Sequence, residues 1–95
     1  MKLKVIDFWA AWCGPCRMLG PIVDELIIDY KDNAQVEILK VNVDEQPEIS
    51  VQYGIRTLPT ILFINAETDG VVDKQLGALP RTKLEELITK YTSLK

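Results

Sequence analysis

Four segments of the chain have the hydrophobic pattern of β-strands. Residues 3–10 are almost continuously apolar, which is typical of a strand buried on both faces. The strand predicted from Val36 to Val43 and the one at residues 60–64 are rich in β-branched side chains. A turn segment at residues 65–70 leads to a fourth strand at residues 71–76, so the last two strands are predicted to form a hairpin.

Two helices are predicted between these strands. The first extends to about Lys31, and its apolar residues recur every three or four positions. They are Cys16, Leu19, Val23, Leu26, Ile27 and Tyr30. The second is a short helix at residues 47–53, with Pro47 near its start and Gly54 just past its end.

A last amphipathic helix carries Leu84, Leu87, Ile88 and Tyr91 at helical spacing. The sequence allows two positions for the start of this helix: a capping box from Thr82 to Glu85, or Pro80 at the first helical position. The order of elements predicts an α/β fold with a βαβ unit, a β-hairpin and a C-terminal helix around a four-stranded mixed sheet. The first two strands should be parallel, because a helix connects them.

The composition indicates one globular domain and narrows the classes of function. Of the 95 residues, which we expect to form a single domain over residues 1–95, 47% are hydrophobic and 26% are charged. The net charge of −3, without a Lys/Arg cluster, argues against binding to nucleic acid or to a membrane. The N-terminal apolar run is interrupted by Lys4 and Asp7, unlike a signal peptide, so we expect a cytoplasmic protein.

The chain has two cysteines and no histidine. A structural zinc site needs about four Cys or His ligands, so a single chain cannot supply one. Nucleophiles activated by histidine are excluded as well. Cys13 and Cys16 lie three positions apart, and in a reducing compartment such a pair is more often catalytic than structural.

A CxxC sequence that opens a helix after a strand has a definite chemistry. Cys13 would lie at the helix N-terminus, where free N–H groups and the helix dipole favour a thiolate. It would attack a substrate disulfide, and Cys16, one turn further on, would resolve the mixed disulfide. Gly14 and Pro15 help to set the relative stability of dithiol and disulfide, because proline stiffens the turn. The alternative is a pair of reduced cysteines that only fill core space.

Asp7 is an acid within an otherwise apolar strand. A buried carboxylate is costly, so it should be protonated or paired. Six residues before Cys13, it could lie beneath the CxxC helix and take the proton from Cys16. It could equally face solvent. Lys40, inside another apolar run, is either a partner for Asp7 or a lysine that reaches past its apolar neighbours to water.

Leu58, Pro59 and Thr60 lead into the third strand. Proline cannot donate to a β-ladder, so Pro59 belongs at the start of that strand, although the local sequence does not establish a cis bond. Two tryptophans flank the cysteine motif. Trp9 is predicted to lie in the core, and Trp12 is predicted to be a contact surface, a lid, or both.

These features together resemble the thioredoxin family. The resemblance runs in order over nearly the whole chain and rests on residues 7–16 (DFWAAWCGPC), Pro21, residues 40–44 (KVNVD), residues 53–60 (YGIRTLPT) and Gly77-Ala78. It implies a thioredoxin fold and the reduction of protein disulfides. It also implies that Cys13 attacks, that Cys16 resolves, and that Asp7 is a buried acid with Lys40 beside it.

The resemblance further implies a substrate-binding groove opposite the cysteines. Pro59 would be cis, and the backbone of Leu58 would bond to an extended substrate. The expected groove residues are Trp12, Gly14, Pro15, Thr57, Leu58, Pro59, Gly77 and Ala78. Electrons would come from NADPH through thioredoxin reductase, with no cofactor or metal bound by this chain, and the partners would be that reductase and substrate proteins with disulfides.

The chain departs from the family in one respect. Thioredoxins usually carry a strand and a helix before the strand that matches residues 3–10, whereas this chain starts at that strand. The strand from Val36 to Val43 is therefore predicted to be an edge, in a monomer that self-associates weakly through it.

Two other functions are open. One is a specialised reductant or isomerase, but Gly14-Pro15 favours a general reductant, because family oxidants and isomerases usually carry other dipeptides there. The other is a docking module with idle thiols, which the complete CGPC motif with Asp7 and Pro59 disfavours.

Overall fold

Seven elements form where the hydrophobic pattern changes along the chain. The structure is a computed structural model and describes residues 1–94. The elements are β1 (Leu3–Trp9), α1 (Gly14–Asp29), β2 (Val36–Asn42), α2 (Pro47–Gln52), β3 (Thr60–Asn65), β4 (Val71–Leu76) and α3 (Arg81–Thr92). Every predicted strand and helix is present, and the ends of β1, α1, β2, α2 and β3 differ from the prediction by one or two residues.

The four strands form one mixed sheet in the order β2-β1-β3-β4. β1 and β2 are parallel, as the strand–helix–strand order predicts. β3 lies antiparallel to both β1 and β4, which confirms the predicted hairpin. β2 is at one edge of this sheet, as expected.

The start of α3 differs from both predicted versions. Pro80 is the N-cap residue in extended conformation (φ −67°, ψ 152°), one position before the helix, and no side chain caps this end. Thr82 lies inside the first turn. Instead, the Arg81 guanidinium bonds Glu85 one turn further on and two acids of α1, Glu25 and Asp29. A tertiary ion cluster therefore accompanies this helix start where a local capping motif was expected.

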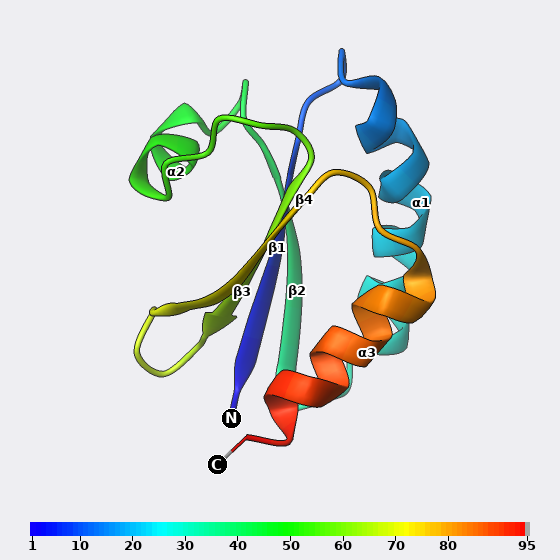
Figure 1. The fold of residues 1–95 in the computed structure, drawn as a ribbon, viewed down its shortest axis with the longest axis vertical. Helices are drawn as coiled ribbons and strands as arrows, with labels where there is room; N and C mark the ends of the chain where they lie inside the picture. The colour runs from blue at the N-terminus through cyan, green and yellow to red at the C-terminus, as the bar shows by residue number, and fades with distance from the viewer. Residues whose placement is uncertain (95) are drawn as a thin grey trace.

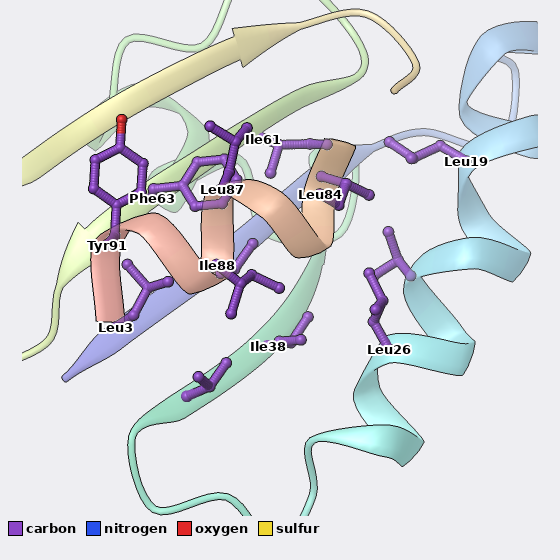
Figure 2. Close-up of a cluster of buried hydrophobic side chains, with 13 residues drawn as sticks. Leu3, Leu19, Leu26, Ile38, Ile61, Phe63, Leu84, Leu87, Ile88 and Tyr91 are labelled. Atoms are coloured by element: carbon purple, nitrogen blue, oxygen red, sulfur yellow. The ribbon is translucent and has the colours of Figure 1, made fainter. Parts of the chain in front are cut away.

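The helices cover the two faces of the sheet unequally. In Figure 1, α1 and α3 lie on one side of the sheet and α2 on the other. The larger core lies under α1 and α3, and Figure 2 shows its side chains converging from the sheet and both helices. Its buried residues are Leu3, Val5, Leu19, Val23, Leu26, Val36, Ile38, Ile61, Phe63, Leu84, Leu87, Ile88 and Tyr91.

The opposite face has a smaller core under α2. Its buried residues are Ile6, Phe8, Val41, Leu62 and Ile64. Because side chains alternate between the faces of a strand, the odd-numbered residues of β1 point toward α1 and the even-numbered ones toward α2. This alternation places Asp7 on the α1 side.

Candidate active site

The loops at one end of the sheet meet because of the strand register. The last residues of β1 pair with the first residues of β3, with Phe8 opposite Thr60. Thr60 in turn lies opposite Leu76, the last residue of β4. The loop after β1, the loop before β3 and the loop after β4 are therefore neighbours. These loops carry Cys13, Pro59 and Gly77, and Cys16 lies three residues after Cys13 in α1.

Cys13 is the N-cap residue of α1. Its backbone is extended (φ −88°, ψ 111°), and its Sγ accepts a hydrogen bond from the Cys16 backbone N–H at 3.3 Å. Pro15 lies in the first turn, where no N–H is needed. The two cysteines form a disulfide with their Cα atoms 5.3 Å apart, and both are buried. The alternative of two reduced cysteines that only fill the core is therefore wrong.

Asp7 is buried on the α1 side of the sheet, so the solvent-facing alternative is wrong. The residue is 1% exposed, and its Oδ1 has no hydrogen-bond partner among residues 1–94. Burial raises the pKa of this carboxyl to about 6; the charge of Lys40 lowers the pKa and that of Asp24 raises it. An acid with such a pKa can gain and lose a proton near neutral pH.

Lys40 lies beside Asp7 in the sheet, since the two are Cα partners of β2 and β1. Its ammonium, however, bonds a carboxylate that the sequence did not suggest: Nζ lies 3.1 Å from Asp24 Oδ1 on α1. The same Nζ lies 5.1 Å from the centre of the Trp9 ring. Helical spacing could have pointed to Asp24, which follows Cys16 by eight residues and so lies near the same side of α1.

Trp9 is half-buried rather than a full core residue. It packs against the cluster of Ala10, Cys13 and Cys16. Its ring also forms part of the wall of a cavity of about 260 Å³ beside Cys16. This cavity explains why the ring is not fully enclosed.

The Leu58–Pro59 peptide bond is cis, as the resemblance implied. Leu58 packs against the cysteine cluster, and the Pro59 carbonyl accepts a hydrogen bond from the Gly77 N–H at 2.8 Å. Gly77 has a positive φ of 85°, which glycine adopts without strain. Thr57 is exposed, and its carbonyl accepts a hydrogen bond from the Thr60 hydroxyl.

Three of the expected groove residues line two separate hollows. Trp12 and Leu58 line one of about 230 Å³, whose other lining residues are Val43, Ser50, Ile55 and Arg56. Trp12 is 68% exposed, and its indole N–H donates to Asp44 at 2.9 Å. Ala78 lines a separate hollow of about 220 Å³ with the exposed Met18. Sequence reasoning missed Ile55, Arg56 and Asp44 as contact residues, although they belong to the segments that carry the resemblance.

The other two expected groove residues border the cysteines in sequence. Gly14 and Pro15 are exposed at the start of α1, between Cys13 and Cys16. A side chain at Gly14 would meet no atom within 4 Å. Position 14 therefore borders open space next to the disulfide.

A disulfide-forming cysteine pair at a helix start, next to a buried acid and a proline loop, defines the class of a dithiol–disulfide oxidoreductase. Residues 1–94 bring together no group of three or more Cys, Asp or Glu side chains that could hold a metal ion. Along the same residues, no helix combines the length and apolar character that crossing a membrane requires.

Comparison with known proteins identifies the family. The family model described as Thioredoxin matches residues 1–90, and the chain belongs to the thioredoxin family. It is 48% identical over 90 residues to thioredoxin 2 of Chlorobaculum tepidum, an alignment that covers 95% of this chain and 79% of that protein. It is also 48% identical over 88 residues to thioredoxin 1 of Synechococcus elongatus, covering 92% and 78% of the two chains.

A solved structure agrees with this assignment. The thioredoxin of Malassezia sympodialis superposes with a TM-score of 0.80 at 41% sequence identity, over 96% of this chain and 76% of that one. The chain thus has the thioredoxin fold and is a dithiol–disulfide oxidoreductase that works through a redox-active disulfide.

Proposed function

We propose that the chain reduces disulfides of other proteins, with Cys13 as the attacking thiolate and Cys16 as the resolving thiol. Cys13 forms a bond to one sulfur of the substrate and releases the other as a thiolate. Cys16 then attacks Cys13, which releases the second substrate sulfur and leaves the substrate as a dithiol. The observation that carries this assignment is the position of Cys13 Sγ at the N-cap of α1, where it accepts the Cys16 N–H.

Asp7 is the acceptor of the proton that Cys16 loses when it attacks. Its carboxyl is buried on the α1 side, and its pKa of about 6 leaves most of it ionised at pH 7 yet basic enough to take a proton. Lys40 tunes this acid through its charge and makes no direct hydrogen bond to it among the contacts of the described residues.

Substrates dock in the two hollows as an extended segment. The Leu58 backbone bonds to that segment, Trp12 and Pro15 contact its side chains near the cysteines, and Thr57 and Gly77 border it. The exposure of the Trp12 ring and the packing of Leu58 on the cysteine cluster support this placement. Ala78, in the second hollow, extends the contact surface.

Thioredoxin reductase restores the dithiol with electrons from NADPH, and the chain acts in the cytoplasm as one domain over residues 1–95. The family membership supports the role of the reductase, and the match of residues 1–90 to a single family model supports the single domain. The protein is a monomer that self-associates weakly at high concentration through β2. Among residues 1–94, β2 pairs only with β1 and is therefore an edge strand of the sheet, open to pairing with another chain.

Reduction of insulin disulfides by dithiothreitol tests the activity, with and without the protein. Wild type is expected to accelerate the reaction, and Cys13→Ser to abolish the acceleration. Cys16→Ser is expected to accumulate a mixed disulfide with insulin, whereas Cys13→Ser accumulates none. Accumulation in the Cys13 variant instead would reverse the two roles.

A further inference from the structure

The cavity of about 260 Å³ beside Cys16 holds an ion pair whose acidic member, Asp24, has no role in the proposed mechanism. Asp24 and Lys40 both line this cavity, together with Cys16. It is separate from the two hollows assigned to substrate. Asp24 lies on the same helix as Cys16, and its side chain is 60% exposed, so it can be replaced without disturbing the core.

Two carboxylates, those of Asp7 and Asp24, are possible partners for the Lys40 ammonium. The lysine leaves β2 next to Asp7 and on the same face of the sheet, because the two residues are Cα partners. Nevertheless, its Nζ bonds Asp24 at 3.1 Å, and Asp7 Oδ1 has no partner among the residues described.

One further contact holds the ammonium in this place. The Trp9 ring lies 5.1 Å away, within the range of a cation–π interaction. The ammonium also lies close to α1, because a Cβ at Gly20 would be 3.7 Å from Nζ, an ordinary contact distance.

The charges around Asp7 act in opposite directions. Lys40 favours the carboxylate form of Asp7 and Asp24 disfavours it, while burial is the largest influence. The other cation at the cavity is Arg17, whose guanidinium is bonded to the Ala11 carbonyl at 3.1 Å. Cys16 also lines the cavity, where it is held in the disulfide with Cys13. The effect of these charges on Asp7 therefore depends on where the Lys40 ammonium lies relative to the two acids.

We propose that Asp24 is a positioning residue that holds the Lys40 ammonium at the cavity wall and away from the Asp7 carboxylate. Without Asp24, the ammonium turns toward Asp7, which is the Cα partner of Lys40 in the sheet and whose Oδ1 has no hydrogen-bond partner among residues 1–94. Asp7 then becomes a weaker base toward the Cys16 thiol. This inference rests on the proposed role of Asp7 as proton acceptor only for its catalytic consequence; the geometric part stands by itself.

The test is a double-mutant cycle read by carbon-13 NMR titration of the Asp7 carboxyl in Asp24→Asn, Lys40→Met and the double variant. Asp24→Asn is expected to lower the titration midpoint of Asp7 by about one pH unit, because a cation approaches it. Lys40→Met is expected to raise the titration midpoint of Asp7. When Asp24→Asn is added to Lys40→Met, it should lower the midpoint by less than half as much as it does in wild type. Asp32→Asn, which removes an exposed acid in the loop after α1, is the matched control and leaves the midpoint unchanged.

An unchanged midpoint in Asp24→Asn overturns the inference. So does an equal fall with and without Lys40, because Asp24 would then act through its own charge alone. The pH dependence of mixed-disulfide resolution by Cys16 is measured on the same variants. If the midpoints move as expected but the resolution rate does not follow them, the positioning role of Asp24 stands and the proposed proton transfer to Asp7 fails.

Discussion

The two faces of the sheet differ in how they are covered. The face under α1 and α3 buries thirteen hydrophobic residues in one cluster, whereas the face under the six-residue α2 buries five. The disulfide and Asp7 belong to the better covered side. Leu58 packs both against the smaller core and against the cysteines, so the loop before β3, where we propose that substrates dock, joins the two sides. The disulfide chemistry thus lies on the better covered side, and the proposed docking loop lies at its boundary.

The largest expected effect compares two phenylalanines, one on each face. Phe63 and Phe8 are both fully buried; Phe63 packs against Tyr91 of α3, and Phe8 against Tyr53 at the end of α2. Phe63→Ala should lower the free energy of unfolding by about 3–5 kcal/mol. Phe8→Ala should cost less, because the thinly covered face can collapse into the space. Urea melts measure both, and a larger loss for Phe8→Ala would break the comparison.

The next effect concerns the buried acid on the well-covered face. Burial raises the pKa of Asp7 from 3.8 to about 6, so the folded state disfavours its carboxylate. Asp7 therefore costs stability progressively as pH rises from about 4 to 6, and the cost is constant above that. Asp7→Asn should be more stable than wild type at pH 7 by about 1–3 kcal/mol and slower in turnover.

Denaturant melts at pH 4 and pH 7 check this expectation, with Asp32→Asn as a control for the loss of one negative charge. The stability advantage of Asp7→Asn should nearly vanish at pH 4. A variant less stable than wild type at pH 7, or an advantage of equal size at both pH values, would contradict it.

A smaller gain is expected at Gly20, inside α1. A Cβ there would have only Lys40 Nζ as a neighbour within 4 Å, at an ordinary contact distance of 3.7 Å. Gly20→Ala should therefore stabilise the protein by about 0.5–1 kcal/mol, the usual helix-interior difference between the two residues. Thermal unfolding measures this, and a loss of stability would show that α1 cannot accept a side chain beside the lysine.

The smallest effect on stability is expected on the thinly covered face. Leu39 of β2 is 39% exposed there. Leu39→Lys should change the free energy of unfolding by less than about 0.5 kcal/mol, since the position is on the surface. It should also weaken self-association in sedimentation velocity at high concentration, because charge blunts an edge strand. If Leu39→Lys left self-association unchanged, the contact between copies would not involve this part of β2.

The sequence predicted the elements well because each one depends on local pattern. Val71–Leu76 has the bounds expected from its β-rich run, and α1 begins just after Cys13, as its Pro15 indicated. The pairing of Lys40 with Asp24 was not predictable in the same way, because it depends on where α1 crosses the sheet. Likewise, the ion cluster at Arg81 joins residues more than fifty positions apart, and the local capping signals gave the wrong start for α3.

The cysteine pair closes a ring of only four residues. In the chain-entropy account of cross-links, so short a loop removes little freedom from the unfolded chain, about 2 kcal/mol, compared with about 4.7 kcal/mol for a loop of a hundred residues. Oxidation and reduction therefore change the stability of the fold by less than a cross-link over a long loop would. A carrier that passes electrons repeatedly can in this way change its redox state many times while the sheet and its larger core remain folded.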